Sequence, residues 1–191
     1  MTVAINARAA VRAEIGGVER VAREMAARLP AIAPGRYRVV RPPTALAHRA
    51  GHAWEQGWLP LEARAAELIY SPANLAPVAS RRNVVVIHDV AALSHPEWYG
   101  RAYVAWQRAL LPAIARRARL VITVSEFSRG EIERVLGVEA EVIPNGVDER
   151  FKPGPPAERP YVLAVGTQIA RKNLAVLAAT AEALREHGIE L

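Results

Sequence analysis

The chain has 191 residues, of which 51% are hydrophobic and none is cysteine, and its 25 basic and 19 acidic residues give a net charge of +6. This composition argues against a disordered chain and excludes a disulfide framework or a cysteine nucleophile, and no apolar run approaches the roughly 20 residues that span a bilayer. The N-terminus lacks the pattern of a signal peptide, so we expect a cytoplasmic protein, and the basic charge favours anionic partners.

Apolar runs of strand length alternate with helical patterns along the chain, which predicts βα units and a mostly parallel sheet. The expected strands cover residues 3–7, 37–40, 67–70, 83–87, 120–124, 141–143 and 161–165. The expected helices cover residues 18–29, 54–66, 100–118, 126–136 and 171–187. Pro112 should kink or split the third of these helices. Residues 41–51 and 71–82 are predicted to be loops.

A proline-rich break divides the chain. Residues 151–160 hold four prolines and a glycine, so neither a helix nor a central strand can pass through them. We therefore expect one domain over residues 1–150, a linker over 151–160 and the start of a second domain over 161–191. With one strand and one helix, this last segment cannot bury its own apolar faces.

Five arginines lie on or beside the helix expected over residues 100–118, which also carries aromatic and aliphatic side chains. They are Arg101, Arg108, Arg116, Arg117 and Arg119. Their simplest interpretation is a solvated helix face. The alternative is a basic amphipathic helix that docks on an acidic membrane surface, such as the inner face of the plasma membrane. Nucleic acid is not an expected partner, because no known nucleic-acid-binding motif accompanies the charge.

A pair of cations near the end of the chain is a candidate phosphate site. Arg171 and Lys172 follow an apolar, strand-like run that ends at Gly166, and they open a helical pattern. The first N–H groups of a helix are free, and with the positive helix end they attract phosphate. Arginine and lysine would add charge-assisted hydrogen bonds to a diphosphate there.

His88 and Asp89 place a titratable pair at the carboxyl end of the strand expected over residues 83–87. Open α/β sheets bind their ligands at this edge, and histidine can donate or accept a hydrogen bond near neutral pH. We therefore interpret the pair as a candidate catalytic site. In the alternative, structural interpretation, His88 fixes a loop and Asp89 caps the following turn.

Gly16 and Gly17 lie between the first strand and the first helix. Glycine there allows positive φ and close approach of the backbone to a ligand at the helix N-terminus, although the same pair also suits a plain turn. The glycine pattern differs from G-x-G-x-x-G, and the second strand ends at Arg41 instead of an acidic residue. Both features disfavour a nicotinamide-dependent dehydrogenase.

Two further patterns carry little weight. His48 and His52 have the i, i+4 spacing of a helical metal pair, but the neighbouring prolines and glycine disfavour a helix, so no metal site is expected. Ser125 ends a strand just before Glu126, which is the pattern of a helix N-cap and not of a nucleophile.

Seven motifs occur in a fixed order over nearly the whole chain. They are Gly16-Gly-Val-Glu-Arg20, Trp54-Glu-Gln56 with Leu59-Pro60, Ser71-Pro-Ala-Asn74, Ile87-His-Asp89 with His95-Pro-Glu-Trp-Tyr99, Thr123-Val-Ser-Glu-Phe127, Ile143-Pro-Asn-Gly-Val-Asp148 and Val165-Gly-Thr-Gln-Ile-Ala-Arg-Lys-Asn-Leu174. Together they resemble glycosyltransferase family 4, the group 1 retaining enzymes, and in particular the mannosyltransferase-like members that build bacterial O-antigen and exopolysaccharide. The resemblance covers the N-terminal half of the family's length.

This resemblance implies the GT-B fold, in which two Rossmann-like domains face each other across a cleft. The N-terminal domain would bind a glycan or lipid-linked acceptor, and the C-terminal domain would bind a nucleotide-sugar donor such as GDP-mannose. The chain would then comprise the whole N-terminal domain, a parallel sheet with helices on both faces, and the first βα unit of the second domain.

The resemblance also implies roles for the candidate residues. Arg171 and Lys172 would hold the donor diphosphate and stabilise the charge that develops on it, so that no metal or other cofactor is needed. His88 would contact the transferred sugar near the reacting centre, with Asp89 beside it. The glycines at 16 and 17 would close over the donor phosphates.

Two departures from the family pattern bear on activity. Ala170 replaces the proline that commonly precedes Arg-Lys, which should alter loop stiffness more than chemistry. The family's E-x7-E segment, which grips the donor ribose and sugar, would lie beyond residue 191, so we expect these residues alone not to complete a transfer cycle. The alternatives are a non-catalytic acceptor- or membrane-binding half that needs a partner chain, and a fragment that folds poorly.

Overall fold

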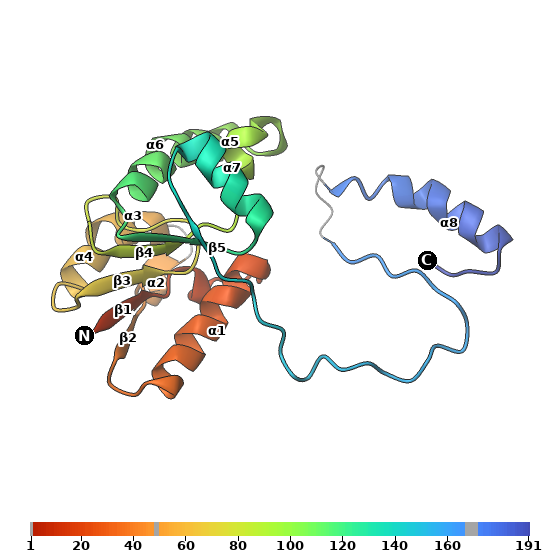
Figure 1. The fold of residues 1–191 in the computed structure, drawn as a ribbon, viewed down its shortest axis with the longest axis horizontal. Coiled ribbons are helices and arrows are strands. Elements are labelled where there is room, and N and C mark those ends of the chain that lie inside the picture. The colour runs from red at the N-terminus through yellow and green to blue at the C-terminus, as the bar shows by residue number, and fades with distance from the viewer. Residues whose placement is uncertain (1, 48–49, 167–171) are drawn as a thin grey trace. The chain divides into compact units, whose positions relative to one another are not determined.

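A computed structural model describes residues 2–47, 50–166 and 172–191, and the chain divides into two compact units, Met1–Asn145 and Gly146–Leu191 (Figure 1). The strands are β1 Val3–Asn6, β2 Tyr37–Val40, β3 Leu68–Ser71, β4 Asn83–Val86, β5 Leu120–Thr123 and β6 Glu141–Val142. The α-helices are α1 Gly17–Ile32, α2 Thr44–Ala47, α3 Gly51–Gly57, α4 Leu59–Glu62, α5 Ala91–Ser94, α6 Arg101–Arg117, α7 Glu126–Leu136 and α8 Val176–Glu186. The first unit also contains the 3-10 turns η1 Ala9–Val11 and η2 Pro96–Trp98.

The strands of the first unit form one six-stranded sheet among the described residues, in the order β2-β1-β3-β4-β5-β6, and every neighbouring pair is parallel. This all-parallel sheet with helices around it confirms the predicted Rossmann-like α/β class. The strand order reverses at β1, because the chain first adds β2 on one side of it and then returns to add β3 on the other. Such a switch point leaves a crevice outside the carboxyl ends of the strands.

Helices cover both faces of the sheet. Successive residues of a strand point to opposite faces, so neighbouring strand residues show which helix packs on which face. In β1, Ala4 belongs to a buried cluster with Trp54 of α3, whereas Ile5 belongs to another with Ala26 of α1. A third and larger cluster joins β4 and β5 to α6 and α7. These layers leave the strand ends as the places where polar side chains can gather.

The helix expected over residues 54–66 is in fact two helices, α3 and α4. Trp58 separates them, and Pro60 lies in the first turn of α4, where the missing N–H costs no hydrogen bond. Helix α6, in contrast, runs unbroken through Pro112, although the sequence predicts a kink or a split there. The carbonyl that Pro112 leaves without a donor belongs to Arg108, which is exposed, so water can bind it.

The loop predictions are partly wrong. Residues 41–51 contain α2 and the start of α3, whereas residues 71–82 contain no helix or strand after Ser71. The short helices α2 and α5 were not predicted, because a single turn is too short to show the 3.6-residue apolar period on which a helix prediction depends.

The strand expected over residues 161–165 does not form. Tyr161 makes a single bridge to Glu190, and the residues up to Gly166 have no regular structure. A strand needs hydrogen-bonded neighbours, and among the described residues of the second unit this segment has one bridge partner, Glu190.

Helix α8 begins at Val176, five residues later than predicted. Asn173 has φ 45°, in the left-handed region, and an α-helix cannot continue through that conformation. Lys172 therefore precedes the helix and does not open it. Arg171 lies outside the described residues.

Along the sequence, the boundary between the two compact units falls between Asn145 and Gly146, a few residues before the linker predicted over 151–160. The division into an acceptor-side domain and the start of a donor-binding domain stays a prediction. Helix α8 buries no side chain. Among the helices that the structure describes, none is long and apolar enough to cross a membrane.

Candidate functional site

The carboxyl ends of β1, β3 and β4 are neighbours in the sheet, and polar residues gather there. Asn6 ends β1 and Arg8 lies two residues further on, while Ser71 ends β3 and His88 follows β4. Because the strand order reverses at β1, this is the edge where a parallel α/β sheet places its ligand crevice.

Asn6, Arg8 and Glu55 form a buried polar network between β1 and α3. Glu55 Oε1 accepts hydrogen bonds from Asn6 Nδ2 at 2.6 Å and from Arg8 Nε at 3.0 Å. Asn6 Nδ2 also lies 3.2 Å from Ser71 Oγ. Glu55 is 1% exposed and Arg8 is 7% exposed. Burying two charges costs desolvation energy that an apolar pair avoids, so stability alone is a poor explanation for this network.

The surroundings of Glu55 favour its ionised form. Burial acts to raise the pKa of Glu55, but His52, Arg8 and Asn6 together outweigh burial and hold the pKa below its ordinary value of 4.5. The second carboxylate oxygen, Oε2, lies 3.5 Å from His52 Nδ1 and makes no hydrogen bond to a described residue. Arg8 therefore faces a full negative charge on its Nε side.

A pocket of about 150 Å³ lies beside this network. We call it the switch-point pocket, because its walls include the segments that follow β1 and β3, together with residues of α1, α3 and α6. Its polar lining consists of Arg8, Arg12, Glu19, His52, Asn74, Tyr103 and Gln107. Arginine and amide donors outnumber the single carboxylate in this lining.

His88 is 8% exposed, and its backbone and side chain are both fixed. Its N–H donates to Asn74 Oδ1 at 2.8 Å, and its carbonyl accepts from Ser128 Oγ at 2.9 Å. Its Nε2 lies 2.9 Å from the carbonyl of Pro72, which can only accept, so the proton is on Nε2. The loop-fixing role considered from the sequence is therefore present, and within the described residues Nδ1 has no hydrogen-bond partner.

Asp89 is exposed, and its Oδ1 accepts from the N–H of Ala91 at 3.0 Å, at the start of α5. This is the capping role that the sequence offered as the structural alternative. Partial burial raises the pKa of Tyr103, and the negative charge of Asp89 adds to the shift. Tyr103 consequently stays a neutral hydroxyl at the mouth of the switch-point pocket.

Gly16 is the N-cap of α1 with φ −88° and ψ −176°, so it does not use the positive φ that the sequence analysis considered. Gly17 is likewise outside the left-handed region. The N–H of Gly16 donates to Glu19 Oε2 at 3.1 Å, which places a carboxylate at the N-terminus of α1. The role of these glycines towards a donor phosphate stays a prediction, as does that of Lys172.

Of the histidine pair considered for a metal, the structure describes His52. His52 contacts Glu55 and packs edge-to-face on Trp106 with ring centroids 5.9 Å apart, and His48 lies outside the described residues. Within residues 2–47, 50–166 and 172–191, no three histidine or acidic side chains are grouped as metal ligands.

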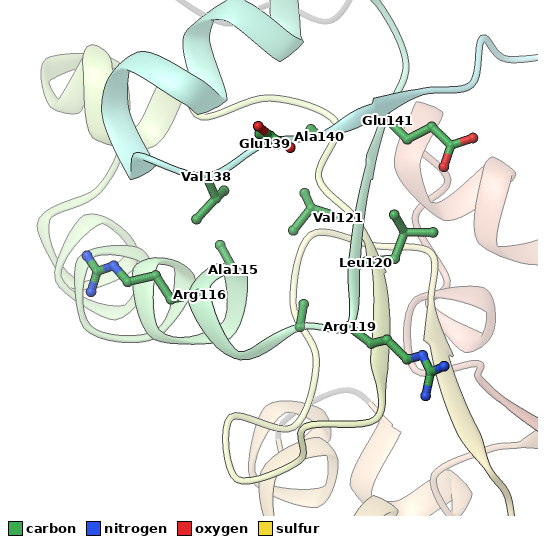
Figure 2. Close-up of a pocket in the computed structure, with 10 residues that line it drawn as sticks. Ala115, Arg116, Arg119, Leu120, Val121, Val138, Glu139, Ala140 and Glu141 are labelled. Atoms are coloured by element: carbon green, nitrogen blue, oxygen red, sulfur yellow. The ribbon is translucent and has the colours of Figure 1, made fainter.

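A larger hollow of about 520 Å³ lies at the opposite edge of the sheet, beside the first residues of β5 and β6. Figure 2 shows Val121 and Val138 beside this hollow, with the charged ends of Arg116 and Arg119 extending away from its centre. Because these polar groups do not converge, we do not regard this hollow as the candidate site.

Sequence reasoning missed Asn6, Arg8 and Glu55 as site residues. A signal was available: Asn6 and Arg8 close the first strand, and Glu55 lies within the quoted motif Trp54-Glu-Gln. The pairing of Arg8 with Glu55 spans 47 positions of sequence, so no local pattern could reveal it.

The parallel sheet, its switch point and the polar side chains at its carboxyl edge define a Rossmann-like α/β domain with a candidate ligand crevice. The model of Glycosyltransferase Family 4 matches residues 35–151, and the chain belongs to this family. The chain is also similar to O-antigen chain mannosyltransferase B of Escherichia coli, with 28% identity over 144 residues. That alignment covers 67% of this chain and 37% of the relative, so the chain spans little more than a third of the relative's length.

Proposed function

We propose that these residues form the acceptor-side half of a retaining, metal-independent hexosyltransferase. The enzyme would transfer a hexose from a nucleotide-diphosphate sugar to a glycan or lipid-linked acceptor. Family membership, together with the polar crevice at the carboxyl ends of β1, β3 and β4, is the observation that carries this proposal. The name of the Escherichia coli relative supports mannose as the sugar, GDP-mannose as the donor and cell-surface polysaccharide as the product class.

His88 is the residue to which we assign the contact with the transferred sugar. Its ring is held by Pro72 and its backbone by Asn74 and Ser128, so Nδ1 is presented in a fixed orientation. A preoriented group of this kind needs little reorganisation when the glycosidic bond breaks. Asp89, beside it, keeps the adjoining turn in place and contributes negative charge.

Arg171 and Lys172 would hold the donor diphosphate, and Gly16 and Gly17 would approach it from the first domain. The support for these roles is the match of the residues to the family motifs and the favourable interaction of phosphate with cations and free backbone N–H groups. Stabilisation of the leaving diphosphate by cations is the basis for proposing a metal-independent reaction.

The test is a transfer assay with the longest reading frame that contains these 191 residues. With GDP-mannose and a lipid-linked or glycan acceptor, mannosylated product and free GDP should form together, detected by mass spectrometry. His88→Ala should lower kcat by about a hundredfold or more, as expected for loss of a group that acts at the reacting centre. His187→Ala, an exposed histidine at the end of α8, is the matched control.

If the His88→Ala variant keeps the wild-type kcat, His88 has no role in the reaction. Absence of transfer and of donor binding with every nucleotide sugar tried would contradict the proposed function itself.

A second candidate function is docking on an acidic membrane surface, with catalysis supplied by a partner chain. The observation that favours it is the exposed side of α6 and η2, where Trp98, Tyr103 and Trp106 are 42%, 43% and 37% exposed. Arg101 and Arg108 are exposed on the same helix. Aromatic rings and arginines exposed on one helix suit the headgroup region of an anionic bilayer.

A further inference from the structure

The switch-point pocket contains a buried cation that the roles assigned above do not use. Arg8 is 7% exposed and donates Nε to Glu55, but its terminal nitrogens make no hydrogen bond to any residue that the structure describes. Arg8 also lines the pocket, so these nitrogens are accessible from it. A guanidinium with one edge fixed and the other open is a fork suited to two oxygens of one anion.

The rest of the network keeps this fork in position. Glu55 holds Nε of Arg8 at 3.0 Å, and Asn6 donates to the same carboxylate oxygen at 2.6 Å. The backbone N–H of Arg8 donates to Asn6 Oδ1 at 3.2 Å, which fixes the segment that carries the side chain. Glu55 therefore restricts Arg8 before any ligand arrives, which lowers the entropy cost of binding.

We propose that the switch-point pocket binds an oxyanion carried by the substrate, a phosphate or a carboxylate, with Arg8 as the binding residue and Glu55 as its positioning residue. Arg12 supplies a second positive charge, and Tyr103 and Gln107 supply neutral donors. A volume of about 150 Å³ admits one such group and little more. We assign this oxyanion to the sugar acceptor, and this assignment rests on the proposed function. The binding of an oxyanion in the pocket does not depend on the proposed function.

Glu19 opposes this ligand from inside the pocket. Its carboxylate accepts from the N–H of Gly16 at 3.1 Å and lies 3.4 Å from Arg12 Nη1, so it partly neutralises that arginine. Removing the charge of Glu19 should therefore strengthen oxyanion binding, whereas removing the charge of Arg8 should weaken it. Two substitutions with opposite expected effects make the proposal testable even where one of them perturbs folding.

The experiment titrates the 191-residue chain with inorganic phosphate, glucuronate and glucose at low ionic strength, followed by NMR or calorimetry. Phosphate and glucuronate probe the two sources of the oxyanion, a phosphorylated lipid carrier and an acidic sugar, and glucose is the neutral control. Arg8→Met with Glu55→Met removes both buried charges together, which preserves folding better than removal of one. The matched charge control is Arg81→Gln. Arg81 is exposed just before β4, at the amino ends of the strands and so away from the pocket.

At least one oxyanion should bind while glucose does not, and the tighter of the two identifies its source. The Kd of the tighter-binding oxyanion should rise by about tenfold or more in the double variant. The same Kd should fall by about threefold to tenfold in Glu19→Gln. Arg81→Gln should leave it unchanged. Equal binding by the double variant, an unchanged Kd in Glu19→Gln, or a comparable loss in Arg81→Gln would each overturn the proposal. Because this readout is direct binding, its failure is distinct from a failure of sugar transfer.

Discussion

At the scale of single residues, the carboxylate of Glu55 dominates the electrostatics of the candidate site. Three side chains act on it, and their combined effect keeps its pKa below 4.5 despite burial. A carboxyl with a lowered folded-state pKa stabilises the fold fully above its unfolded pKa. That stability is lost as the pH falls through the folded value, because the unfolded chain takes up the proton first.

We therefore predict that Glu55→Gln destabilises the chain by about 3–5 kcal/mol near neutral pH, because Arg8 is left buried without its counter-charge. The difference from wild type should be largest above pH about 4.5 and should narrow as the pH falls below it. Urea unfolding between about pH 7 and pH 3 measures this. Glu139→Gln, at an exposed position beside β6, controls for loss of one negative charge. A difference independent of pH would contradict the lowered pKa.

His88 shows how a catalytic and a structural interpretation can apply to one side chain. Its Nε2 is committed to Pro72 and its backbone to Asn74 and Ser128, all of which the sequence could suggest only as a general loop-fixing role. The position of His88 at the end of a central strand was predictable from the apolar run before it. Its partners were not, because they lie 14 to 40 positions away, in the loop after β3 and in helix α7.

At the scale of elements, the sequence predicts the strands of the first unit best. Strands β1 and β4, for example, are short and mostly apolar runs that the parallel sheet largely buries on both faces, so composition and length suffice to locate them. The run over residues 161–165 has a similar composition but forms only an isolated bridge to Glu190 among the described residues of its own unit, which local sequence cannot reveal. The one-turn helices α2 and α5 were missed for the opposite reason: they form in the structure, but they are too short for the sequence to show a helical period, so only tertiary context determines them.

Helix α6 is the element on which the membrane alternative depends. Arg101→Gln with Arg108→Gln should weaken binding to vesicles that contain anionic phosphatidylglycerol by tenfold or more, given about 1 kcal/mol for each basic residue at such a surface. Vesicle sedimentation at low salt measures this. Arg36→Gln with Arg81→Gln removes the same charge from exposed positions before β2 and β4, and it should have little effect. Equal losses in the two double variants would indicate non-specific attraction, and absence of binding by the wild type would end the membrane alternative.

At the scale of the whole molecule, the boundary between the two units is the main expectation still to be tested. Residues 146–160 contain no helix or strand, and Arg150, Lys152 and Arg159 are exposed there. Brief trypsin treatment should therefore cleave first after Arg150 and leave residues 2–145 intact, because cleavage requires an extended, accessible backbone. The other two positions precede Pro153 and Pro160, and trypsin does not cleave bonds to proline. Mass spectrometry of the early fragments identifies the sites. Early cleavage at Arg81 or elsewhere within the first unit would contradict a single compact domain there.

The walls of the switch-point pocket are contributed by segments that lie up to about a hundred positions apart, from Arg8 after β1 to Gln107 in α6. No partly folded form that lacks either the first strand or this helix can contain the complete pocket. A small molecule held there would consequently report on the integrity of the entire first unit. Its binding would stabilise this unit against global unfolding, and every backbone amide that exchanges only through global unfolding would gain the same protection, however far it lies from the pocket.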